Sequence, residues 1–150
     1  MHRLFRFTGT LVACTGLLAA LGCGSSSSEP SSPSPQPAYS QIDLQEGTGA
    51  AAAAGNTVTV NYTGWLYDNT RTDSKGTQFD SSLSAGRQPL TFVVGAANII
   101  QGFSQGVTGM RVSGMRRIVL PSSLAYGAQG SGAIPPNTPL VFEITLLSVQ

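Results

Sequence analysis

The chain has very little of the side-chain chemistry on which most hydrolases and metalloenzymes depend. Its 150 residues include two cysteines, Cys14 and Cys23, and one histidine, His2. All three precede residue 24, so the rest of the chain holds no thiol, no disulfide and no imidazole. Serine-protease, cysteine-hydrolase and zinc mechanisms are therefore excluded for that part, and we expect neither a metal nor another cofactor.

Charge is also scarce, and neither sign dominates. Eight Lys and Arg face seven Asp and Glu, which gives a formal net charge of +1. The nearest approach to a basic cluster is Arg111, Arg116 and Arg117. Two or three arginines along a strand are more typical of a solvated face than of a phosphate site, so we expect no nucleic-acid partner.

One hydrophobic run stands out, over residues 7–21, after a basic start that contains Arg3 and Arg6. The run is too short, and too interrupted by threonine and glycine, for a membrane-spanning helix. A basic start followed by such a run is typical of a secretory signal. We therefore predict that residues 1–22 form an export signal.

The end of this run, Ala20-Leu21-Gly22-Cys23, resembles the signal of a bacterial lipoprotein, which implies that Cys23 carries a lipid. Two alternatives stay open. The stretch that ends at Cys14 fits the lipoprotein box better but leaves a very short apolar core, and a plain signal without lipid is the third reading. The lipoprotein reading places the protein in the bacterial cell envelope, anchored to the outer membrane and facing the periplasm, with the membrane and leaflet left open.

Residues 23–38 are rich in Ser and Pro and carry only one charge, Glu29. Such a composition has nothing apolar to bury and predicts a disordered tether. The remaining residues, 39–150, suit one folded domain. The tether contains no helical dimerisation segment, so we expect a monomer.

Within 39–150, apolar residues alternate with polar ones at the period of strands. This period-two pattern, or an apolar run closed by Gly or Pro, predicts strands at 57–65, 90–94, 116–120 and 140–146. Ile99, Phe103 and Val107 recur at helical spacing, with Asn98 placed as the cap. A polar loop is predicted over 67–78. Antiparallel strands with one short helix give an α+β fold class.

Five short blocks occur in a fixed order between residues 60 and 136. They are Val60-Asn61-Tyr62-Thr63-Gly64, Gln78-Phe79-Asp80-Ser81-Ser82, Ile99-Ile100-Gln101-Gly102-Phe103, Ala125-Tyr126-Gly127 and Ile134-Pro135-Pro136. Together they resemble the FKBP-type peptidyl-prolyl isomerases, over a region from about residue 42 to residue 150. The resemblance implies an antiparallel sheet wrapped around one short helix, and an enzyme that accelerates rotation about X-Pro bonds.

Such a reaction needs no nucleophile, because no covalent bond breaks. The barrier of ~18–20 kcal/mol comes from amide resonance. The twisted transition state is less dipolar than the planar amide, so a dry aromatic pocket favours it. A lowering of roughly 4–7 kcal/mol would give a turnover of about 10–10³ per second.

The resemblance assigns roles to individual residues. Phe103 stands where the family usually has Trp, as the floor under the proline ring, and Ile134 belongs to the overhanging flap. Tyr62, Asp80 and Tyr126 are the polar catalytic group, in which Tyr126 donates to a substrate carbonyl, and the N–H of Ile100 is a further donor. The remaining substrate-binding residues are Phe79, Phe92, Ile99, Ile100 and Phe142.

Each of these residues also has an ordinary structural interpretation. Taken singly, the phenylalanines and isoleucines are typical of a core, and Asp80 is typical of a turn. Leu90, where many relatives have Phe, and Phe103 are the two departures that bear on affinity and on the residue preferred before proline.

Proline-containing unfolded or flexible polypeptides are the expected partners, and the macrolide inhibitors of the family are further candidate ligands. Two other functions stay open. One is a non-catalytic proline-binding chaperone module, and the other is a structural envelope lipoprotein.

Overall fold

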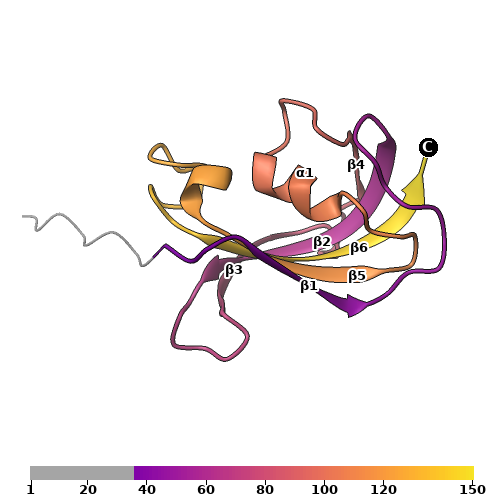
Figure 1. Cartoon of the computed structure of the whole chain (residues 1–150). Coiled ribbons are helices and arrows are strands. Elements are labelled where there is room, and N and C mark those ends of the chain that lie inside the picture. Colours follow the sequence, from indigo (N-terminus) through magenta and orange to yellow (C-terminus); the bar gives the residue numbers. More distant parts are fainter. Residues whose placement is uncertain (1–35) are drawn as a thin grey trace, which may run out of the picture. The chain divides into compact units, whose positions relative to one another are not determined.

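The computed structural model describes residues 36–150 (Figure 1). The predicted signal, Cys23 and most of the predicted tether lie outside the described residues. Within 36–150, no helix is both long enough and apolar enough to cross a membrane.

A six-stranded antiparallel sheet forms the body of this region. Its main path runs β1-β5-β6-β2-β3, and β4 pairs with β2. The elements are β1 (Ser40–Gln45), β2 (Thr57–Tyr67), β3 (Lys75–Ser81), β4 (Leu90–Val93), α1 (Gln101–Val107), β5 (Met115–Leu120), η1 (Ser122–Leu124) and β6 (Leu140–Val149). The predicted α+β class, an antiparallel sheet wrapped around one short helix, is confirmed.

The two central strands, β2 and β6, follow the alternation seen in the sequence. Val58 and Val60 are fully buried on β2, and Ile144 and Leu146 are fully buried on β6. Burial of alternate residues follows from the pleat, which sends successive side chains to opposite faces. One face of the sheet therefore carries the core.

The α-helix within residues 36–150, α1, lies across that apolar face (Figure 1). Phe103 and Val107 point into the core and are 3% and 0% exposed. A Cβ on Gly106 would lie 2.8 Å from the Ile118 side chain, so glycine allows the helix to approach β5 closely. The predicted cap is wrong, because the helix is preceded by Ile100 rather than Asn98 and has no side-chain cap.

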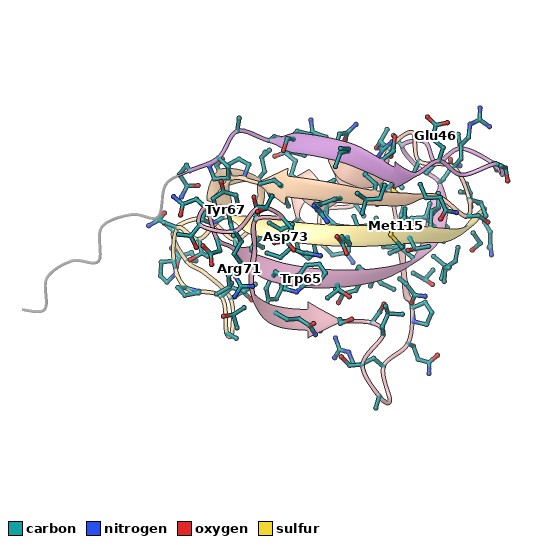
Figure 2. The ribbon with its side chains drawn as sticks, turned by 90° about the horizontal axis from the view of Figure 1, so that it is seen from below. Glu46, Trp65, Tyr67, Arg71, Asp73 and Met115 are labelled. Atoms are coloured by element: carbon teal, nitrogen blue, oxygen red, sulfur yellow. The ribbon has the colours of Figure 1, made fainter. Side chains whose placement is uncertain are left out.

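The outer face of the sheet carries polar and aromatic side chains (Figure 2). Lys75 Nζ lies 4.7 Å from the centre of the Trp65 ring and 3.1 Å from Glu143 Oε1. The predicted loop over 67–78 is wrong in its bounds, because Tyr67 still belongs to β2 and pairs with Lys75 at the start of β3. Only residues 68–74 form the turn, which the Asp68 carboxylate stabilises by accepting from the Thr70 N–H at 2.9 Å.

Arg116 contradicts the expectation of a solvated arginine face, since it is only 7% exposed. Its guanidinium donates to both carboxylate oxygens of Asp43, at 2.6 and 3.1 Å. It also donates to the carbonyls of Gly106 and Thr108 at the end of α1, at 2.9 and 3.1 Å. The residue that composition alone assigns to solvent thus ties β1 and β5 to the helix.

Candidate active site

An aromatic cluster lies between the sheet and α1. Phe103 is at its centre, with ring centroids 5.2 Å from Phe142, 5.7 Å from Phe92 and 5.8 Å from Tyr62. Phe79 packs edge-on against Phe142 at 5.7 Å. These distances and tilts are those of favourable aromatic pairs. Because β2, β3, β4, β6 and α1 each supply one ring, the cluster exists only in the folded sheet.

Gly64 in β2 allows this packing. A Cβ at this position would lie 2.6 Å from the ring of Phe79 and 2.8 Å from the ring of Phe142. Two rings therefore occupy the space that a side chain on β2 would need.

A cavity of about 140 Å³ opens above the cluster. It is lined by Tyr62, Leu90, Asn98, Ile99, Ile100, Phe103, Tyr126 and Phe142. None of these residues carries a formal charge at neutral pH, and most of them are apolar. The cavity has room for one small ring and offers a poor environment for a strongly dipolar group.

A hydrogen-bonded polar group stands beside the cavity. The Tyr62 hydroxyl donates to Asp80 Oδ2 at 2.5 Å, and Arg87 Nη2 donates to Asp80 Oδ1 at 2.7 Å. The backbone N–H of Ser81 also donates to Oδ1, at 2.9 Å. Burial, followed by the hydrogen bond to Asp80, raises the pKa of Tyr62 to about 12. Tyr62 therefore keeps its proton at physiological pH and holds the carboxylate in place.

Tyr126 reaches the cavity from the segment between η1 and β6. The N–H of Gly127 donates to the Ser122 carbonyl at 2.9 Å, and the N–H of Asn137 donates to the Gly127 carbonyl at 2.8 Å. Burial, and then the charge of Asp80, raise the pKa of the Tyr126 hydroxyl. Among residues 36–150 that hydroxyl has no hydrogen-bond partner. It is a protonated donor directed at a cavity without charge.

The N–H of Ile100 is a second donor at the cavity. It precedes the first turn of α1 and donates to no acceptor in the part of the chain that the structure describes. Two donors and an apolar floor therefore converge on a space that fits one ring.

Residues 49–147 match the model of a family described as FKBP-type peptidyl-prolyl cis-trans isomerase. The chain belongs to this FKBP family. The activity of this protein is the cis-trans isomerisation of X-Pro peptide bonds.

Curated relatives agree with this membership. An FK506-binding protein of Neisseria meningitidis serogroup A is 47% identical over 108 residues, which cover 71% of this chain and 92% of the relative. An FK506-binding protein of Streptomyces anulatus is 42% identical over 109 residues, covering 71% and 82%.

Solved structures of FKBP relatives share the fold. A peptidyl-prolyl cis-trans isomerase from Pseudomonas syringae pv. tomato superposes with a TM-score of 0.61 at 37% identity, over 75% of each chain. FkpA from Escherichia coli gives a TM-score of 0.62 at 36% identity, over 75% of this chain and 48% of FkpA.

The FKBP fold brings most of the residues predicted from the sequence to one place. The predicted residues that line the cavity are Tyr62, Ile99, Ile100, Phe103, Tyr126 and Phe142. Phe79 and Phe92 lie behind this lining, in ring contact with Phe142 and Phe103. Asp80 lies outside the lining; it accepts a hydrogen bond from Tyr62, and its charge raises the pKa of Tyr126.

Ile134, like Phe79, Asp80 and Phe92, does not line the cavity. It is 6% exposed and packs into the core, in a turn closed by its bridge to Ser131. The flap that it occupies nevertheless continues into Asn137, whose N–H holds Gly127 beside Tyr126.

Two residues at the site were not predicted to belong to it. Arg87 lies seven residues after Asp80, in a loop without periodicity. Nothing in the sequence around this single arginine indicates that it pairs with Asp80. The sequence predicts Asn98 only as a helix cap, yet this residue lines the cavity. The block Ile99-Ile100 that follows it could have drawn attention to its neighbour.

Proposed function

We propose that the cavity above Phe103 binds the proline ring of the substrate, and that the enzyme acts on X-Pro bonds of exported proteins from a lipid anchor. The binding of proline is inferred from the cavity of about 140 Å³, which is uncharged and has a phenylalanine at its floor. The planar amide loses water when its proline enters this space. The twisted transition state needs that water less, so the cavity stabilises it relative to the ground state.

Tyr126 is proposed to donate a hydrogen bond to the carbonyl of the residue before proline. Its raised pKa keeps the hydroxyl protonated, and no group within residues 36–150 competes for that proton. The N–H of Ile100 is proposed to bind the next substrate carbonyl. These donors hold the chain on both sides of the bond while it rotates.

Tyr62, Asp80 and Arg87 are proposed to shape the wall of the site. The short hydrogen bond from Tyr62 to Asp80 fixes the Tyr62 ring, which lies 5.8 Å from Phe103. The Asp80 carboxylate also favours the protonated form of Tyr126. Catalysis therefore rests on position and on exclusion of water.

The same cavity is the proposed site for a macrolide inhibitor, which the names of the FK506-binding relatives suggest. Phe103 offers a smaller floor than tryptophan would, and it has no indole N–H. We expect such inhibitors to compete with proline peptides. Tryptophan fluorescence would be a poor probe, because the only Trp, Trp65, lies on the outer face (Figure 2).

Export and anchoring are proposed from residues 1–23 alone. The basic start, the apolar run and Cys23 support a lipoprotein of the cell envelope, in which the enzyme is a monomer facing the periplasm. Labelling with a radioactive fatty acid tests this. Wild type should incorporate label and sediment with membranes, and Cys23→Ser should do neither, while Cys14→Ser should behave as wild type.

The role of the cavity is tested by the isomerisation rate of a short Leu-Pro peptide. Tyr126→Phe should lower kcat/KM about tenfold through one lost hydrogen bond, and Asp80→Ala should lower it at least as much. Tyr67→Phe, which removes a hydroxyl from the outer face (Figure 2), is the matched control and should not change the rate. Wild-type rates in Tyr126→Phe and Asp80→Ala would place the site elsewhere.

The non-catalytic chaperone module is not favoured by the family membership. Saturable binding of the peptide by wild type, with no acceleration of its isomerisation, would select it over the enzyme.

A further inference from the structure

A second, larger groove adjoins the cavity above Phe103. It measures about 500 Å³ and is lined by residues 95–101, Ser104 and residues 123–125. It shares Asn98, Ile99 and Ile100 with the cavity, and its other wall ends at Ala125, directly before Tyr126. Figure 1 shows α1 and the orange turn at η1 on the same side of the sheet. The two hollows therefore meet along one segment, residues 98–100.

The sizes of the two hollows suggest different occupants. The cavity of about 140 Å³ is smaller than the ~300–1,000 Å³ of ordinary ligand sites, whereas the groove falls within that range. A polypeptide advances by at most ~3.3–3.6 Å per residue, so the neighbours of a bound proline must lie against the walls next to the cavity. Residues 98–100 are such a wall, with the groove behind it.

The groove also offers free backbone groups. Neither the N–H nor the C=O of Ala97 or Asn98 is hydrogen-bonded within residues 36–150. The side chains of Asn98, Gln101 and Ser123 likewise have no partner in this described part of the chain. Free main-chain donors and acceptors beside a groove are the means by which proteins bind extended peptides irrespective of sequence.

The lining decides which peptides the groove accepts. No Asp, Glu, Lys or Arg is among its residues, and the wall at Gly95, Ala96 and Ala97 has almost no side-chain bulk. Nothing there would compensate a charged side chain, while small or apolar side chains fit against it.

We propose that this groove is an extended subsite, which binds the uncharged residues adjoining the proline in an extended polypeptide. The proposal rests on the proposed binding of proline above Phe103. It predicts that the enzyme discriminates between long and short substrates, although the bond that rotates is the same.

The test compares a Leu-Pro tetrapeptide with the same peptide extended by three uncharged residues, before the leucine in one series and after the proline in another. The purified protein should act on at least one extended peptide with a kcat/KM about tenfold higher, as expected from two hydrogen bonds of ordinary net strength. The series in which kcat/KM rises shows whether the groove binds residues before or after the proline. Extension by glutamates or lysines should give much less gain.

Two variants block the groove from opposite walls. Ala97 and Ser123 are both exposed, so Ala97→Trp and Ser123→Trp should fold, which urea unfolding verifies. Both should lose the gain from extension and keep the wild-type rate on the tetrapeptide. Ala54→Trp, at an exposed position outside the groove, is the control and should keep both.

The outcomes separate this proposal from the one on which it rests. Equal rates on short and extended peptides in wild type would overturn the subsite, as would a gain that survives both blocking variants. Loss of the tetrapeptide rate in both blocking variants would also overturn it, because the groove would then be part of the proline site. A tetrapeptide rate that is insensitive to Tyr126→Phe and Asp80→Ala would instead refute the proposed proline site.

Discussion

Two arginine–aspartate pairs in this molecule have the same chemistry and different surroundings. Arg116 meets Asp43 with its side chain 8% exposed, and its guanidinium also binds two backbone carbonyls. Arg87 meets Asp80 with its side chain 54% exposed and makes one hydrogen bond. The first pair joins β1, β5 and the end of α1, and the second stands beside the cavity above Phe103.

The difference shows that burial and the number of partners decide what an ion pair does. Replacing a buried guanidinium leaves several buried acceptors without a hydrogen bond, which lowers the free energy of unfolding. An exposed ion pair stabilises the fold only slightly, because water and salt screen the attraction between its charges. Arg116 should therefore contribute mainly to stability, and Arg87 mainly to the geometry of Asp80 and Tyr62.

The largest expected effect comes from removing the buried partner. Arg116→Met should lower the free energy of unfolding by about 2–4 kcal/mol, because the carbonyls of Gly106 and Thr108 lose their donor. Urea unfolding followed by circular dichroism measures it. Arg111→Met, which removes an exposed guanidinium with one hydrogen bond to Gly49, should change stability by less than about 0.5 kcal/mol. Equal effects of the two substitutions would contradict the assignment.

Removing the exposed partner should affect activity more than stability. Arg87→Met removes one of the two donors to Oδ1 of Asp80 and leaves the N–H of Ser81 as the other. We expect kcat/KM to fall about threefold, with a change in the free energy of unfolding under ~1 kcal/mol. Because the Debye length is only ~3 Å at 1 M salt, high salt should reduce the difference between wild type and variant. Arg71→Met, which breaks an exposed pair with Asp68, is the control and should leave activity unchanged. A large loss of stability without loss of activity would reverse the roles assigned to the two pairs.

The pH dependence of stability should separate the two pairs. The hydrogen bond from Arg116 lowers the pKa of Asp43 below its ordinary 3.8, so this contribution is present above that value and is lost as pH falls through the lowered pKa. The pKa of Tyr62 is raised from 10.0 to about 12, so its contribution is complete below pH 10 and is lost between pH 10 and 12. Asp43→Asn should therefore flatten only the acid limb of the stability profile, and Tyr62→Phe only the alkaline limb. Urea midpoints measured from pH 2.5 to 11.5 test this, and a variant that flattens the opposite limb would disprove it.

The smallest expected effect concerns a polar link without charge. Gln36 accepts from the N–H and hydroxyl of Ser122, at 2.9 and 3.0 Å, and donates to the carbonyl of Asn137 at 2.8 Å. It thus joins both ends of the segment that carries Tyr126. Because Gln36 is itself exposed and the link carries no charge, Gln36→Ala should lower the free energy of unfolding by under ~1 kcal/mol and lower kcat/KM about twofold. Gln105→Ala, on the exposed side of α1, should leave kcat/KM unchanged, and an unchanged rate in Gln36→Ala would show that this link does not position Tyr126.

Local patterns were sufficient to predict the α+β class and four of the six strands, but not β1 or β3. The arrangement of the sheet around the helix was predicted from the resemblance to the FKBP family. The alternation in β2 and β6 is a direct consequence of one buried face, and the recurrence of Phe103 and Val107 follows from a helix packed on that face. The aromatic blocks could be placed together because their order resembled that of the FKBP family. Neither argument needed the distances that the structure supplies.

What could not be predicted depends on contacts between distant residues. Arg116 is buried because Asp43, 73 residues earlier, pairs with it, and no periodicity within β5 reveals this partner. Gln36 bonds across 86 and 101 residues, although the surrounding composition is that of a tether. The start of the helix was predicted too early because Asn98 has the right chemistry for a cap. In the structure the helix begins after Ile100, and Asn98 lines the cavity.

Phe103 and Phe142 form the floor of the cavity and are also core residues, each 3% exposed. Disordering the floor would therefore require melting the domain, so catalytic activity and global structure should disappear together during denaturation. Few substitutions should be tolerated at these two positions, since any change in the shape of the floor also changes the free energy of unfolding. The rim at Leu90, Asn98 and Ile99 is more exposed, and we expect specificity to diversify at these positions first.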